Sequence, residues 1–155
     1  MSDMGRWTDR LAELGIELPG VVTPLAAYVP ALRSGSHVYT SGQVPMVAGE
    51  LAAAGKVGAE ISAEDAKQHA RTCALNALAA VDSLVGLDSV VRVVKVVGFV
   101  ASAEGFTGQP GVINGASELL GEIFGDAGRH ARSAVGVAEL PLGAPVEVEL
   151  IVEVE

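Results

Sequence analysis

Apolar and polar residues alternate strictly at the end of the chain. Between Val146 and Glu155, four valines and Leu150 fall on one side of an extended strand, and four glutamates with Ile151 fall on the other. The alternation predicts a β-strand with one apolar face. A second run, 90–100 (VVRVVKVVGFV), is almost continuously apolar. It predicts a strand that is buried on both faces.

Three segments have apolar residues at helical spacing. Residues 62–85 follow the 3.6-residue period. Ser62 is a suitable N-cap with acidic residues in the first turn, and Gly86 ends the pattern. A second helix is predicted over 111–125, and a short one over 6–14, before a Pro-Gly break.

The remaining segments complete the order of elements. A hairpin is predicted where a Ser/Gly turn separates residues 26–32 from residues 37–40. Residues 45–58 are predicted to form a connection with at most one short strand. A further strand is predicted over residues 132–140. The order hairpin, helix, strand, helix, strand, strand predicts an α+β fold. In this fold a single mixed β-sheet carries two helices on one face, so its other face meets something else. We expect one domain over 1–155, with 1–20 as an N-terminal helical extension.

Composition narrows the classes of function. The formal net charge is −9, from 10 basic and 19 acidic residues, so no nucleic-acid partner is expected. The chain shows no signal-peptide pattern and no apolar run of about 20 residues, so we expect a cytoplasmic protein without membrane contact. Cys73, the single cysteine, is interpreted as a small buried hydrophobe. The three histidines lie far apart and no nucleotide-binding motif is present, so neither metal nor cofactor is expected.

Three segments together resemble a known family. Tyr28 precedes the segment 41–45 (SGQVP), 112–114 (VIN) opens the second predicted helix, and 131–141 (ARSAVGVAELP) leads to 146–149 (VEVE). From about Tyr28 to Glu155 the chain resembles the RidA/YjgF family, also labelled endoribonuclease L-PSP-like. The resemblance implies the chorismate-mutase-like/YjgF fold and a homotrimer with a central barrel and inter-subunit pockets. It also implies hydrolysis of 2-aminoacrylate and related enamines or imines to 2-keto acids and ammonia, without a cofactor.

The resemblance assigns roles residue by residue. Arg132 matches the arginine that holds the substrate carboxylate, and Glu147 the glutamate that orients the attacking water. The substrate-binding positions are Tyr28, Ser41, Gly42 and Asn114. These residue types suit the chemistry, because a guanidinium presents a planar fork to a carboxylate. An imine carbon needs only a placed water and a group that handles its proton. The expected partner is a small carboxylate-bearing substrate.

Each residue also has an ordinary interpretation. Arg132 and Glu147 suit a solvated strand, Tyr28 suits packing, Asn114 a helix cap and Ser41 a turn. The order and spacing of the whole set favour the functional interpretation.

Two positions depart from the family pattern. His130 stands where the family usually has proline or a small residue, and Ala134 where many deaminase-type members have cysteine. These departures keep an alternative open: a non-catalytic protein that binds small carboxylates such as 2-keto acids. A third interpretation, a ribonuclease, derives only from the family's other label, and the acidic composition argues against it.

The two proposed catalytic residues begin successive strands. Strands joined by a short segment normally run antiparallel, which places Arg132 and Glu147 near opposite ends, about 20 Å apart in one chain. A site that uses both is therefore expected to draw on two subunits.

Overall fold

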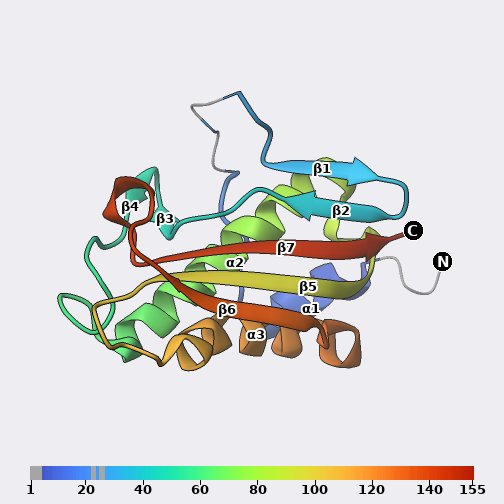
Figure 1. The fold of residues 1–155 in the computed structure, drawn as a ribbon. Coiled ribbons are helices and arrows are strands. Elements are labelled where there is room, and N and C mark those ends of the chain that lie inside the picture. The colour runs from blue at the N-terminus through green and yellow to red at the C-terminus, as the bar shows by residue number, and fades with distance from the viewer. Residues whose placement is uncertain (1–4, 22–23, 25–26) are drawn as a thin grey trace.

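The computed structural model describes residues 5–21, 24 and 27–155. Five strands form one mixed sheet in the order β1-β2-β7-β5-β6 (Figure 1). β5 is antiparallel to β7 and parallel to the edge strand β6. The strands are β1 (Ala31–Ser34), β2 (His37–Thr40), β5 (Val90–Ala101), β6 (Ala131–Val137) and β7 (Val146–Val154). The helices are α1 (Arg6–Leu14), α2 (Ala63–Val85) and α3 (Gln109–Phe124), with short 3-10 turns η1 (Leu87–Ser89), η2 (Gly125–Gly128) and η3 (Pro141–Gly143).

Helices α2 and α3 both lie behind the sheet in the view of Figure 1 and cover the same face. This confirms the predicted α+β fold with a mixed sheet and two helices on one side. On β7 the burial alternates as predicted: Val146, Val148, Leu150, Val152 and Val154 are buried under the helices.

The prediction that β5 is buried on both faces is wrong for the single chain. Val93, Val96 and Val100 are fully buried on the helix side, but Val91 is 41% exposed and Phe99 is only partly covered. The reason is that both helices pack on the same side of the sheet. The opposite face, called the open face below, has no covering element among the described residues.

The connection before α2 contains one strand more than expected. β3 (Met46–Val47) and β4 (Glu50–Leu51) pair as a separate hairpin. Ala48 and Gly49 between them both have positive φ, 52° and 84°, as a two-residue hairpin turn requires. A strand of two residues is too short to show an alternation of apolar and polar positions, so the sequence pattern does not reveal it.

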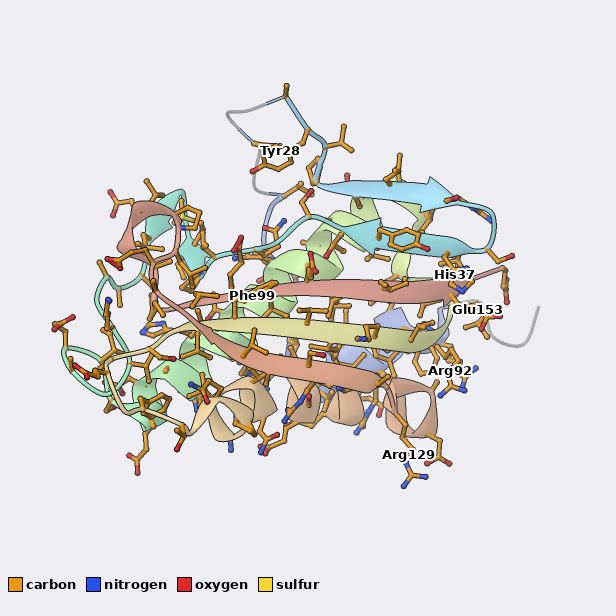
Figure 2. All side chains as sticks on the ribbon, viewed as in Figure 1. Tyr28, His37, Arg92, Phe99, Arg129 and Glu153 are labelled. Atoms are coloured by element: carbon orange, nitrogen blue, oxygen red, sulfur yellow. The ribbon has the colours of Figure 1, made fainter. Side chains whose placement is uncertain are left out.

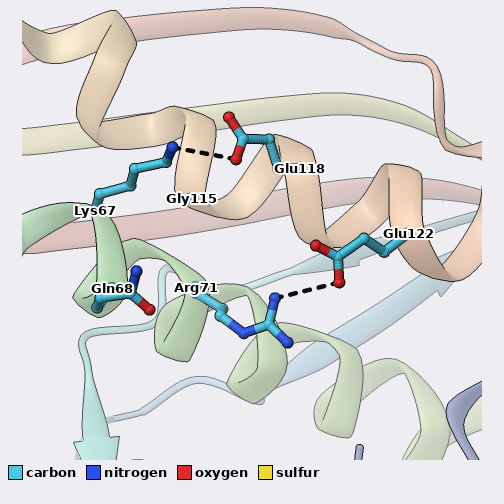
Figure 3. Close-up of a pocket in the computed structure, with 6 residues that line it drawn as sticks. All are labelled: Lys67, Gln68, Arg71, Gly115, Glu118 and Glu122. Atoms are coloured by element: carbon cyan, nitrogen blue, oxygen red, sulfur yellow. Dashed lines mark ion pairs between the residues drawn. The ribbon is translucent and has the colours of Figure 1, made fainter. Parts of the chain in front are cut away.

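Glycine allows the two large helices to approach closely. A methyl group on Gly115 of α3 would collide with the backbone carbonyl oxygen of Lys67 on α2. On the outer surface of the same contact, Lys67 pairs with Glu118 (3.1 Å) and Arg71 with Glu122 (3.6 Å) (Figure 3). Exposed ion pairs contribute at most about 1 kcal/mol each, so backbone fit is the main determinant of this contact.

The predicted short N-terminal helix is confirmed as α1. The Trp7 ring packs edge-on against Phe124 at 4.9 Å, and its Nε1 donates to the Val90 carbonyl oxygen (2.7 Å). The Asp88 carboxylate accepts hydrogen bonds from the backbone N–H groups of Trp7 (2.8 Å) and Thr8 (2.9 Å) and from the Thr8 hydroxyl (2.7 Å). Asp88 of η1 therefore caps α1 across the fold. Treating residues 1–20 as an extension of a single domain stays a prediction.

In the part of the chain that the structure describes, no helix combines the length and apolarity needed to cross a bilayer.

Candidate active site

Arg132 lies near the start of β6 and points toward α3. Its backbone partner on β5 is Val96, which is fully buried on the helix side of the sheet. The Nη1 atom of Arg132 donates to Asn114 Oδ1 (2.8 Å) and to Ser117 Oγ (3.2 Å), and Nη2 donates to the Pro110 carbonyl oxygen at 3.4 Å. The guanidinium is thus held from one side by α3.

These contacts leave one edge of the guanidinium available. Nη1 has two N–H donors, and Asn114 and Ser117 accept both. Nε has no hydrogen bond to any described residue, and Nη2 has only the long contact to Pro110. Parallel N–H groups on Nε and Nη2 match the two oxygens of a carboxylate. The half-buried Arg132 is therefore oriented to receive one.

Glu147 lies on the open face of the sheet. Its backbone partner on β5 is Phe99, on the side that the helices do not cover. Burial raises the pKa of the Glu147 carboxyl, and the negative charge of Glu149 raises it further. Arg132 is not among the causes of this shift within one chain. A raised pKa suits a carboxyl group that takes and returns protons near neutral pH.

Gly42 lies directly against the Glu147 carboxylate. A Cβ atom at Gly42 would come within 2.5 Å of Glu147 Oε1. Any side chain there would displace the carboxyl group, so glycine is needed for this contact. The family motif places glycine at position 42, and the close contact with Glu147 requires glycine there.

Ser41 ties the Tyr28 segment to the end of β2. Its hydroxyl donates to the Val29 carbonyl oxygen (2.6 Å), and its backbone N–H donates to the Pro30 carbonyl oxygen (2.9 Å). The turn interpretation of Ser41 therefore describes its contacts in the single chain. Tyr28 is 55% exposed, and Figure 2 shows it on the segment before β1, away from the centre of the sheet. Among the described residues, a packing role for Tyr28 has no support.

The predicted residues form two groups. Arg132 and Asn114 meet on the helix side, whereas Gly42 contacts Glu147 on the open face, and Ser41 is the residue before Gly42. β6 and β7 run antiparallel as expected, but β5 lies between them. Arg132 on β6 and Leu150 on β7 both pair with Val96 of β5, and Leu150 lies three residues from Glu147 along β7. Three residues along the strand and two strand spacings across the sheet place the Cα atoms of Arg132 and Glu147 about 14 Å apart. The earlier value of about 20 Å was too long because it ignored this register.

Two further residues belong to the Arg132 group. Ser117 was missed, although it lies three residues after Asn114 and so shares its helix face. The other is His130, which departs from the family pattern. His130 Nε2 lies 2.9 Å from Ser117 Oγ, and Nδ1 lies 2.6 Å from the Gly128 carbonyl oxygen. His130 and Arg132 therefore contact the same serine.

Neither Cys73 nor Ala134 supplies a reactive thiol. Cys73 is fully buried, with Sγ 3.7 Å from the Val146 carbonyl oxygen, and burial raises its pKa well above the ordinary value. A thiol in this environment stays protonated and packs as a hydrophobe. Ala134 is partly buried against the core. Across residues 5–21, 24 and 27–155, no three His, Cys, Asp or Glu side chains are grouped to hold a metal ion.

Comparison with known proteins gives consistent matches over nearly the whole chain. Residues 8–154 match the family described as "YjgF/chorismate mutase-like, putative endoribonuclease". Protein TCP17 of Trypanosoma cruzi is 44% identical over 151 residues, which cover 96% of this chain and 94% of TCP17. The crystal structure of Atu1372 from Agrobacterium tumefaciens, a protein of unknown function, is 44% identical with a TM-score of 0.90, covering 99% of this chain and 96% of that one. A "putative endoribonuclease" from Shewanella oneidensis MR-1 is 34% identical with a TM-score of 0.92, covering 96% and 99%.

Proposed function

The chain belongs to the YjgF/chorismate mutase-like family, and on that premise we propose that it hydrolyses small enamine and imine carboxylates of the 2-aminoacrylate type. The products are a 2-keto acid and ammonia. One observation carries the proposal: Arg132 is half-buried, is held by Asn114 and Ser117, and along its Nε–Nη2 edge has only the 3.4 Å contact from Nη2 to Pro110 among the described residues.

This edge accounts for binding of the substrate carboxylate. Two parallel hydrogen bonds from a guanidinium fix both the position and the plane of a carboxylate. Hydrogen bonds to charged groups contribute about 1.5–3 kcal/mol each. Binding of this kind places the adjacent C2 carbon of the substrate at a defined distance from Arg132. The reaction then requires a water molecule that is positioned to attack that carbon.

The reaction needs no oxidant and no group other than water. The enamine first becomes the imine by moving a proton to its terminal carbon. Water then adds to C2: a C–O bond forms, and the C=N electron pair takes a proton on nitrogen. The C–N bond breaks as the new hydroxyl loses its proton and becomes the carbonyl, and ammonia leaves. Glu147 takes the proton of the attacking water and returns it to the departing nitrogen, a role for which its raised pKa is suited.

The pocket is formed between subunits in this proposal. Arg132 of one protomer and Glu147 of a neighbour supply its two ends, in a homotrimer whose open sheet faces line a central barrel. The open face carries exposed apolar side chains that support such packing: Tyr39 (44% exposed), Val135 (43%) and Val91 (41%). Figure 2 shows Phe99 near the middle of this face.

A second function has its own supporting observation. Ala134 replaces the cysteine of many deaminase-type members. This replacement favours a protein that binds 2-keto acids without catalysis. A ribonuclease would have to bind RNA with a net charge of −9, which opposes contact with phosphates.

The test measures keto-acid release from 2-aminoacrylate that is generated enzymatically in the assay. Wild-type protein should accelerate the release, and Arg132→Ala should lower the rate by about 30-fold or more through loss of the charged hydrogen bonds. Arg132→Lys keeps the charge without the planar fork and should recover only part of the rate. Arg71→Ala, on the outer surface of α2, serves as the matched control.

The outcomes separate the candidate functions. Equal rates for wild type and Arg132→Ala would overturn the deaminase proposal. In that case, calorimetric binding of pyruvate that depends on Arg132 would identify the non-catalytic binder. RNA cleavage that persists in Arg132→Ala would point to the ribonuclease.

A further inference from the structure

A continuous chain of hydrogen bonds runs from Arg132 to the turn before β6. Ser117 Oγ lies 3.2 Å from Arg132 Nη1 and 2.9 Å from His130 Nε2. His130 Nδ1 lies 2.6 Å from the Gly128 carbonyl oxygen. Ser117 therefore joins the guanidinium to the imidazole, and the imidazole is tied to the backbone at the end of η2.

The chemistry of the groups sets the direction of two of these bonds. A carbonyl oxygen only accepts, so His130 Nδ1 carries a proton and donates to Gly128. Arg132 only donates, so Ser117 Oγ accepts from it. In the neutral imidazole with its proton on Nδ1, Nε2 is an acceptor for the Ser117 hydroxyl.

We infer that His130 and Ser117 are positioning residues that orient Arg132 for its ligand. Ser117 accepts from Nη1 beside Asn114, and His130 contacts the same Ser117 hydroxyl, so both residues help to fix the guanidinium with Nε free of described partners. The role in ligand binding rests on the proposed function. The role in holding Arg132 does not, because it concerns contacts within one chain.

Other charged groups share the depression in which His130 lies. They come from β5, β2, β7 and the segment before β6, and Figure 2 labels them all: Arg92, His37, Glu153 and Arg129. Arg92 donates to the Arg129 carbonyl oxygen (3.0 Å) and is the backbone partner of Glu153. A test of His130 must therefore change His130 alone and leave these neighbours in place.

Two readouts test positioning without any ligand. Nitrogen-15 NMR of the full-length protein near pH 8 should show His130 with its proton on Nδ1. The same method should show the Arg132 Nε–H as ordered in wild type and mobile in His130→Ala and in Ser117→Ala. His130→Gln, whose amide oxygen can accept from Ser117, should restore the order, and His69→Ala on α2 is the control. A proton on Nε2, or an Arg132 Nε–H that stays ordered in both alanine variants, would overturn the inference.

Calorimetry with pyruvate adds the functional readout. His130→Ala and Ser117→Ala should weaken binding roughly 5- to 10-fold at pH 8, the usual effect of losing one hydrogen bond. His130→Gln should bind as wild type does at pH 8, because its amide oxygen can accept from Ser117. Binding by His130→Gln that is as weak as binding by His130→Ala would contradict the hydrogen-bond role of His130. If wild type binds no pyruvate and releases no keto acid, the proposed function fails, whereas the NMR result still decides the positioning role. Thermal unfolding of each variant verifies that it is folded.

Discussion

Arg132 and Glu147 project from opposite faces of one sheet. The Arg132 side chain contacts α3 on the helix side, and Glu147 lies beside Gly42 on the open face. β5 separates their strands, and the Cα positions are about 14 Å apart by strand spacing. A change of rotamer cannot move either side chain to the other face of the sheet. A site that uses both residues therefore needs a second protomer.

Mixed oligomers test this requirement directly. Arg132→Ala and Glu147→Gln should each have a strongly reduced rate alone, at most a few per cent of that of wild type. When the two variants are unfolded and refolded together in equal amounts, sites that combine Arg132 of one protomer with Glu147 of the other become complete. Random assembly of a cyclic oligomer should restore roughly one quarter of the wild-type rate. Mixing without refolding is the control, and a refolded mixture that stays inactive would contradict the shared site.

Gly42→Ala should reduce activity much more than stability. The three atoms nearest the added methyl group all belong to the flexible end of Glu147, which can move aside at a cost below about 1 kcal/mol. A displacement of the carboxyl group by about 1 Å can lower the rate on the order of 100-fold. Steady-state kinetics and thermal unfolding measure the two effects. Gly20→Ala, with open space around the glycine, should change neither. Normal activity in Gly42→Ala would show that Glu147 needs no fixed position.

Gly115→Ala should destabilise the protein by about 1–3 kcal/mol or more, the typical cost of overpacking. The methyl group meets the rigid backbone of Lys67, so α2 and α3 must separate. Gly121→Ala, on the same helix but with no atom near the new methyl group, should instead stabilise by about 0.4–1 kcal/mol. Urea unfolding measures both. Equal effects of the two substitutions would refute the close helix contact.

Glu147→Gln should raise stability at neutral pH while it lowers activity. Burial and the charge of Glu149 raise the Glu147 pKa in the folded state. The stabilising contribution of the protonated form is present below the unfolded pKa, near 4.3, and is lost as the pH rises through the folded pKa. The neutral glutamine avoids that loss, so its unfolding temperature should exceed that of wild type at pH 7 and converge with it in acid.

The rate should fall by about 100-fold or more, as expected when a general base is removed. Glu104→Gln, in an exposed loop, is the charge-matched control. An unfolding temperature for Glu147→Gln at or below that of wild type at pH 7 would contradict the raised pKa.

Asp88→Ala should loosen α1 and cost about 1 kcal/mol, as loss of an N-cap does. Burial alone would raise the Asp88 pKa, but hydrogen bonds from Thr8, Trp7 and Gly5 outweigh it and lower the pKa. With a lowered pKa, the stabilisation is present above the unfolded value, near 3.9, and is lost as the pH falls through the folded pKa. The difference from wild type should therefore shrink in acid. Asp126→Ala, exposed in η2, is the control for charge alone. A constant difference down to pH 2 would exclude an ionised cap.

Local patterns in the sequence determined the elements and their apolar sides. The alternation along β7, the helical period after Ser62 and the stop at Gly86 depend on neighbours in the chain, and the structure confirms them. The segments around Tyr28, Asn114 and Arg132 were enough to identify the family, because a family motif is a linear pattern.

Only the tertiary structure decided how these elements meet. The insertion of β5 between β6 and β7 follows from strand pairing across long stretches of chain, which no local period encodes. The same holds for the open face of β5, since burial depends on where both helices pack. Ser117 became part of the site because α3 sets it between Arg132 and His130. Sequence alone specifies residue types and local faces, whereas contacts between distant segments arise from packing.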